Sequence, residues 1–105
     1  MKRLIAKGTD LYLITDITGR ILIPKKLLPD HSYYEWTMQQ LDDKRILLTF
    51  DKTKEVKTTR MCIPSYIRYS MNVFGLEAIF KLDRADNGFI LTHCGEEIWN
   101  DISEE

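Results

Sequence analysis

The chain consists of short apolar runs separated by turn residues, a pattern typical of β-strands. Residues 11–15 are rich in strand-forming types, and residues 21–23 form a second apolar run that ends at Pro24. Thr18-Gly19 lies between the two runs and favours a turn, so we predict that they form a hairpin. Proline has a fixed φ and no N–H, which suits the first turn of a helix, and we expect a short helix over residues 24–28.

A second hairpin is predicted after this helix. Residues 36–41 alternate between apolar and polar types, residues 42–44 favour a turn, and residues 45–50 form the returning strand. The first half of the chain therefore predicts a strand, a turn, a strand, a short helix and a hairpin.

The same order of elements recurs about 40 residues later. Residues 20–24 (Arg-Ile-Leu-Ile-Pro) match residues 60–64 (Arg-Met-Cys-Ile-Pro), and the run 46–49 matches 89–92. Few positions are identical, so coincidence stays open as the alternative to a tandem duplication. A hairpin tip at residues 84–88 accounts for the longer second unit, because loops accept insertions at little cost.

Each repeat is too small to bury its own apolar face. We therefore expect a mainly β protein with short helices, in which the two tandem repeats pack as one pseudo-twofold swapped-hairpin β-barrel. Ile23 and Ile63 then share one core, and the dimer is built into one chain, with further oligomerisation left open. The predicted single domain spans 1–105, with repeat one at about 10–51, repeat two at about 54–94 and an acidic tail at 95–105.

Composition argues against several classes of protein. The 105 residues are 44% hydrophobic and 30% charged, and no run approaches the ~20 apolar residues of a membrane span. The N-terminus lacks the long apolar stretch of a secretion signal, so we expect a cytoplasmic protein. We find no G-x-x-x-x-G-K loop and no G-x-S-x-G motif, and we expect neither an enzyme nor a cofactor.

The near-neutral charge of the chain hides an asymmetry. The net charge is −1, yet residues 1–68 hold 13 Lys/Arg and 8 Asp/Glu, whereas residues 69–105 hold 2 and 8. The total argues against a protein that coats nucleic acid non-specifically, but the segregation permits a basic face.

One segment of the first half carries a recognisable motif. Residues 16–24 read Asp-Ile-Thr-Gly-Arg-Ile-Leu-Ile-Pro. They resemble the Asp-x-x-Gly-Arg-apolar-x-Ile-Pro pattern, followed by a short helix with an arginine, of the AbrB/MazE/MraZ swapped-hairpin (SpoVT-AbrB) family. Members pair two such units in an interleaved barrel, from two chains or within one. The resemblance, which is close over residues 10–50 and weaker over 56–93, implies a small DNA-binding transcriptional regulator.

The two halves depart from the family pattern in different ways. In the second half Val56 and Thr59 stand where the pattern has Asp and Gly, although Arg60 and the helix arginine Arg68 are kept. In the first half Leu28 replaces the helix arginine. We therefore expect the two halves to be specialised differently.

Five basic residues are the predicted contacts to duplex DNA. If the halves pair, these residues converge on one face, where arginine can fork onto phosphate or guanine edges and lysine adds charge toward phosphate. The alternative is that they are solvated surface charges and that Asp16 pairs with Arg20 to brace the loop. The predicted contacts are Arg20, Lys25, Lys26, Arg60 and Arg68.

The acidic tail, residues 95–105, supports a second hypothesis. Apolar residues at 98, 99 and 102 fit a short amphipathic helix, which either binds a protein partner or folds back and buries Trp99. Acidic extensions of antitoxins in the resembled family bind proteins. The alternative function is therefore a protein-binding module, antitoxin-like or an inhibitory adaptor, of the kind that phages and mobile elements carry.

Aromatic and metal-ligating residues receive simpler predictions. The aromatic residues of the segment Tyr33-Tyr34-Glu35-Trp36, together with Tyr66 and Tyr69, could stack on single-stranded nucleic acid. We predict instead that they pack in the core or at the barrel end. The two cysteines have no C-x-x-C spacing, so we expect free, partly buried thiols. We predict no metal site from the four ligand-type residues, which are His31, Cys62, His93 and Cys94.

Overall fold

The computed structural model describes residues 4–23, 27, 34–52, 60–86 and 88–94. Most of these residues belong to strands, and one short helix lies between the sixth and the seventh strand. In chain order the elements are β1 (Leu4–Lys7), β2 (Asp10–Ile14), β3 (Arg20–Leu22), β4 (Tyr34–Gln40), β5 (Arg45–Lys52), β6 (Arg60–Cys62), α1 (Ser65–Ser70), β7 (Ile79–Ala85) and β8 (Gly88–Cys94).

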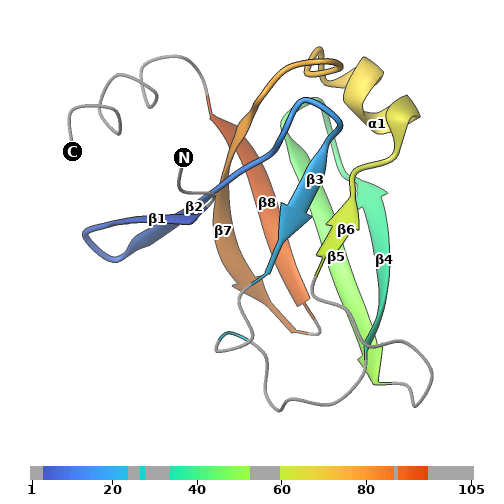
Figure 1. Cartoon of the computed structure of the whole chain (residues 1–105). Helices are drawn as coiled ribbons and strands as arrows, with labels where there is room; N and C mark the ends of the chain where they lie inside the picture. Colours follow the sequence, from blue (N-terminus) through green and yellow to red (C-terminus); the bar gives the residue numbers. More distant parts are fainter. Residues whose placement is uncertain (1–3, 24–26, 28–33, 53–59, 87, 95–105) are drawn as a thin grey trace.

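The strands form one large sheet and one small ribbon (Figure 1). Six strands pair in the order β1-β2-β7-β8-β5-β4, and β3 pairs with β6; all pairs are antiparallel. Among the described strands, none joins the edges β1 and β4, so the sheet is open. The expected closed barrel is therefore wrong, because the β3–β6 ribbon covers one face of the sheet instead of closing its edges.

The predicted hairpin between residues 11–15 and 21–23 does not form. β2 pairs with β1 on one side and with β7 on the other, while β3 crosses to β6. Thr15 fixes the end of β2: its N–H donates to the Ala78 carbonyl at 2.9 Å, and the Ala78 N–H donates to Thr15 Oγ1 at 2.9 Å. Both edges of β2 are thereby filled, which leaves β3 to pair elsewhere.

The later hairpins follow the sequence pattern. β4 and β5 form the hairpin predicted over residues 36–50, and β7 and β8 form the corresponding one in the second half. The predicted tip at residues 84–88 is shorter than expected, because β7 runs to Ala85 and β8 begins at Gly88. The helix expected over residues 24–28 lies outside the described residues except for Leu27.

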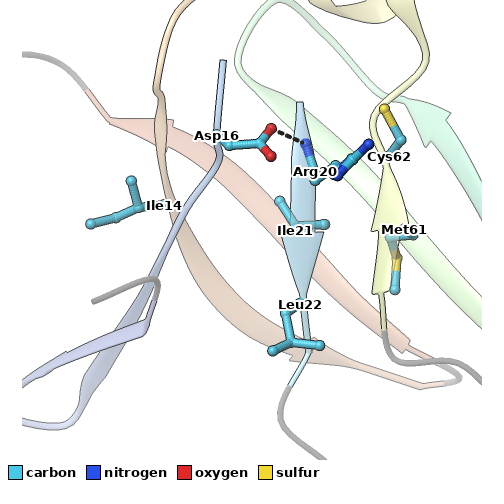
Figure 2. Close-up of a pocket in the computed structure, with 7 residues that line it drawn as sticks. All are labelled: Ile14, Asp16, Arg20, Ile21, Leu22, Met61 and Cys62. Carbon is cyan, nitrogen blue, oxygen red and sulfur yellow. Dashed lines mark hydrogen bonds between the residues drawn. The ribbon is translucent and has the colours of Figure 1, made fainter. Parts of the chain in front are cut away.

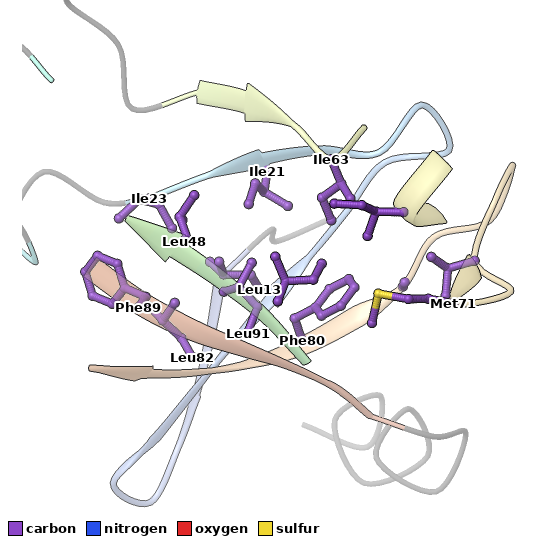
Figure 3. Close-up of a cluster of buried hydrophobic side chains, with 14 residues drawn as sticks. Leu13, Ile21, Ile23, Leu48, Ile63, Met71, Phe80, Leu82, Phe89 and Leu91 are labelled. Carbon is purple, nitrogen blue, oxygen red and sulfur yellow. The ribbon is translucent and has the colours of Figure 1, made fainter. Parts of the chain in front are cut away.

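One apolar cluster fills the space between the ribbon and the sheet (Figure 3). Ile21, Ile23 and Ile63 enter it from the ribbon side, and each is at most 3% exposed. The prediction that Ile23 and Ile63 share one core is confirmed. Trp36 of β4 packs against the cluster while half-buried, and its ring meets the Phe50 ring edge-on with the centroids 5.2 Å apart.

The opposite face of the sheet carries a second, smaller cluster. Tyr12, Ile14 and Ile79 form it, whereas their neighbours Leu13 and Phe80 belong to the main core. Successive side chains of a strand point to opposite faces, so β2 and β7 contribute to both clusters. Within the described residues, no helix is long and apolar enough to cross a membrane.

The pairing between the two halves has a symmetric register. In the ribbon the matched residues Ile21 and Met61 face each other, and in the sheet the matched residues Leu47 and Ile90 do. Exchanging each residue for its counterpart in the other half leaves both registers unchanged. These pairings have the register that a pseudo-twofold axis requires, while the duplication itself stays a prediction.

Candidate nucleic-acid interface

The β3–β6 ribbon has one buried and one exposed face. Ile21 is 3% exposed, whereas its neighbours Arg20 and Leu22 are exposed, as is Cys62 on the other strand. Arg20 pairs with Cys62, and Leu22 pairs with Arg60. Two of the predicted arginines thus occupy diagonally opposite positions on one short ribbon.

The turn that leads into the ribbon is built around the Asp16 carboxylate. Its Oδ1 accepts hydrogen bonds from the Thr18 N–H at 2.9 Å, the Thr18 hydroxyl at 2.7 Å and the Arg20 N–H at 2.9 Å. The hydrogen bond from the Thr18 hydroxyl, followed by that from the Arg20 amide, lowers the pKa of Asp16 below its ordinary value. The carboxylate therefore braces the loop through the Thr18 hydroxyl and two backbone amides, and among the described residues no ion pair joins it to the Arg20 side chain.

Gly19 closes this turn against α1. Its φ is +82°, a conformation that glycine adopts without a steric penalty. A Cβ at this position would lie 2.5 Å from Cδ of Arg68, so the arginine side chain rests directly on the glycine. The Gly19 carbonyl accepts a hydrogen bond from the Ile63 N–H at 2.9 Å, which ties the turn to the end of β6.

Arg68, predicted as a DNA contact, makes its contacts within the protein. Its Nε donates to the Ile63 carbonyl at 2.8 Å, and its guanidinium lies 5.0 Å from the centroid of the Phe74 ring. The side chain is half-buried. This geometry makes Arg68 a positioning residue that links α1, the Asp16 turn and the ribbon.

The structure describes the other four predicted DNA contacts to different extents. Arg20 is exposed, and among the described residues no ion pair engages its guanidinium. Arg60 is placed by its backbone in β6, and Lys25 and Lys26 lie outside the described residues. The structure thus brings Arg20 and the Arg60 backbone to one ribbon and sets Arg68 behind it.

An open groove of about 570 Å³ runs along the ribbon (Figure 2). Its lining is mostly apolar, with the Asp16 carboxylate and the Arg20 guanidinium as the charged groups. The groove could not be predicted from the sequence, because it forms between β2 and β3, a strand that was expected to pair with β2. The lining residues are Ile14, Asp16, Arg20, Ile21, Leu22, Met61 and Cys62.

Cys62 lies on the exposed face of the ribbon, which corrects the expectation of a partly buried thiol. Its Sγ is 3.2 Å from the Thr18 carbonyl, so the thiol can donate to the Asp16 turn. Cys94 is half-buried as expected, and burial raises the pKa of its thiol. Within the described part of the chain, no three His, Cys, Asp or Glu side chains are grouped as a metal site would need; His31 lies outside that part.

The exposed side of α1 carries aromatic residues. Tyr66 and Tyr69 are 68% and 62% exposed, so the prediction that they pack in the core or at the barrel end is wrong for these two residues. Only Ile67 of this short helix is buried in the core. Tyr69 stacks on Phe74 with centroids 4.0 Å apart, and Leu76 is also exposed. We call Tyr66, Tyr69 and Phe74 the aromatic patch.

The chain was also compared with known proteins. No family model, no curated protein and no solved structure matched it. The resemblance to the swapped-hairpin family therefore stays a prediction that rests on residues 16–24.

Proposed function

We propose that this protein binds duplex DNA through the exposed face of the β3–β6 ribbon, as a small transcriptional regulator. The observation that carries the proposal is the exposed Arg20 side chain, unpaired within the described residues, on a two-stranded antiparallel ribbon. The major groove of B-DNA is wide enough to admit a ribbon of this kind. An arginine that is free of ion pairs can fork onto a guanine edge or a phosphate.

The rest of the ribbon supports the same proposal. Leu22 is 43% exposed beside Arg20, and an apolar side chain in the major groove can contact a thymine methyl group. The Asp16 carboxylate and Gly19 hold the backbone of Arg20 in place before any ligand arrives. Such preorganisation lowers the cost of binding.

The experiment is a titration of labelled duplex pools with the full chain at two salt concentrations. We expect the affinity to fall steeply with salt, because phosphate contacts release counterions. Arg20→Ala should weaken binding by roughly tenfold, as expected for loss of one bidentate contact of about 1–3 kcal/mol. Adding Arg60→Ala should weaken it further, while thermal stability changes little.

Arg45→Ala is the matched control. Arg45 is also an exposed arginine at the start of a strand, but its Nε is bonded to Asp42 Oδ2 at 2.7 Å. Its removal should leave DNA affinity within about twofold of wild type. Equal weakening by the two substitutions, or no duplex retained at low salt, would contradict the proposal.

A protein-binding module is the second candidate function, and the aromatic patch favours it. Exposed Tyr and Phe side chains next to an arginine are typical of protein interfaces. Under this alternative, Tyr66→Ser with Tyr69→Ser should abolish capture of a protein partner and leave DNA affinity unchanged. Deletion of residues 96–105, which lie outside the described residues, separates the two functions further: it should abolish capture but preserve or improve DNA affinity.

A further inference from the structure

The strand β4 forms an edge of the sheet that lacks the usual protection. Among the described strands, only β5 is hydrogen-bonded to β4. Proteins guard such edges with lysines, prolines, bulges or very short strands, because unpaired N–H and C=O groups invite another strand. β4 has seven residues, Tyr-Glu-Trp-Thr-Met-Gln-Gln, with neither Lys nor Pro, and its register with β5 is unbroken.

The opposite edge, β1, differs from β4 in length and in carrying a lysine. β1 has only four residues and ends in a lysine, Lys7. Short length and a terminal lysine are devices that discourage edge pairing. A neighbouring strand is therefore expected at β4 and not at β1.

The core is also incompletely covered at β4. Trp36 and Met38 pack against the main cluster but are only half-buried, whereas Thr37 and Gln39 on the other face are exposed. A strand added beside β4 would cover the apolar side chains as well as satisfy the backbone groups. The edge thus offers both hydrogen bonding and apolar burial to an occupant.

We propose that β4 pairs antiparallel with β4 of a second copy of this chain. Facing residues in an antiparallel pair share one face of the sheet. The twofold axis must therefore pass midway between two facing copies of the same residue. Pairing all seven residues places this axis at Thr37. Trp36 then faces Met38 of the other copy, and Glu35 faces Gln39.

The register is self-complementary in charge and in packing. Glu35 is the only charged residue of β4, and the register places it opposite position 39, a glutamine, so no like charges are opposed. Each Trp36 meets a methionine, and sulfur–aromatic contacts are favourable. The axis is perpendicular to the sheet, so the β3–β6 ribbons of both copies lie on the same side of the joined sheet.

Two lysine substitutions on the same face of β4 test this register. Thr37→Lys brings two lysines together across the axis, whereas Gln39→Lys places each lysine opposite Glu35 of the other copy. Sedimentation of the full chain from about 1 μM to 1 mM should show reversible dimerisation at micromolar or weaker affinity, as a small interface implies. The dissociation constant should be roughly tenfold larger for Thr37→Lys than for Gln39→Lys, because like charges repel and opposite charges attract across strands.

A mixing experiment guards against a trivial loss of folding. Thr37→Glu alone should be repelled like Thr37→Lys, but an equimolar mixture of the two variants should dimerise, because Lys then faces Glu across the axis. The proposal is overturned if the wild-type chain stays monomeric throughout the range. It is equally overturned if both lysine variants shift the dissociation constant alike, or if mixing restores nothing.

Discussion

In the turn that begins at Asp16 and in the turn that begins at Asp42, an aspartate carboxylate accepts hydrogen bonds from the backbone that follows it. Asp16 Oδ1 binds the amides of Thr18 and Arg20, and Asp42 Oδ1 binds the amides of Lys44 and Arg45. In both turns the pKa of the aspartate is lowered by hydrogen bonds, led by the Thr18 hydroxyl at Asp16 and the Lys44 amide at Asp42. The two turns are therefore similar in local design, although the second bonded amide lies four residues after Asp16 and three residues after Asp42.

The two turns differ in the contacts of the arginine side chain that follows the aspartate. Arg45 donates its Nε to Asp42 Oδ2, so its charge is partly neutralised within the turn. The Arg20 side chain makes no such bond to Asp16, and the turn is instead covered by Arg68, which rests on Gly19. The comparison shows that a similar local hydrogen-bond pattern does not determine what the arginine side chain contacts. The tertiary surroundings of each turn determine it.

Gly19→Ala should have the largest effect on stability. An alanine at φ +82° is strained, and its Cβ would displace the Arg68 side chain from the contacts that hold it. We expect a loss of about 2–3 kcal/mol in the free energy of unfolding, measured by chemical denaturation. Gly8→Ala is the control, because Gly8 also has a positive φ, +63°, but no heavy atom within 4 Å of the added Cβ.

The control substitution isolates the strain of the backbone alone and should cost only about 1 kcal/mol. Combining Gly19→Ala with Arg68→Ala should cost less than the sum of the single losses, since the two side chains no longer compete for one space. Equal losses at Gly8 and Gly19, or additive losses in the double variant, would show that Arg68 does not rest on the glycine.

Asp16→Ala should have the next largest effect. It removes the acceptor for two amides and one hydroxyl, but water can replace it at this exposed turn, so we expect a loss of roughly 1 kcal/mol. Asp42→Ala should also destabilise the chain, which a lower midpoint of chemical denaturation would show. Only Asp16→Ala should weaken binding of duplex DNA as well, because only that turn positions Arg20; comparable binding by both variants would contradict this difference.

The smallest effect expected is on the pH dependence of stability. The Asp16 carboxylate has a folded pKa below the ordinary 3.8, so its stabilisation is complete above that pH and is lost as the pH falls through the lowered pKa. Asp16→Asn keeps an oxygen acceptor but cannot titrate. The free energy of unfolding of this variant should therefore fall less steeply below pH 3.8 than that of the wild type. Chemical denaturation at a series of acidic pH values measures this difference. Parallel curves would show that the Asp16 carboxylate is not stabilised in the fold.

Local patterns predicted the elements better than their partners. Alternation over residues 36–50 and the turn residues between them were enough to predict a hairpin, because such neighbours need no distant contact to pair. The run 11–15 was correctly predicted as a strand, but β7 and not β3 is its neighbour. Every residue offers the same backbone N–H and C=O groups, so a strand's composition does not specify which distant strand it will join.

The candidate site divides in the same way. Asp16, Gly19 and Arg20 follow from a local motif, since an aspartate, a glycine and an arginine at this spacing form a self-bonded turn. The role of Arg68 could not be inferred, because its contact with Gly19 joins residues far apart in the chain. The exposure of Tyr66 and Tyr69 was missed for a related reason, since α1 buries only Ile67.

The sequence by itself determined most of the strands, the apolar faces of those strands and the presence of a turn at Thr18-Gly19. These properties depend on side-chain alternation and on hydrogen bonds that span at most four residues. Tertiary structure decided that the sheet stays open, that β3 pairs with β6 and that the groove beside Arg20 exists. Those outcomes depend on which distant strands fill the edges of β2, and hydrophobic alternation specifies a buried face without specifying a neighbour.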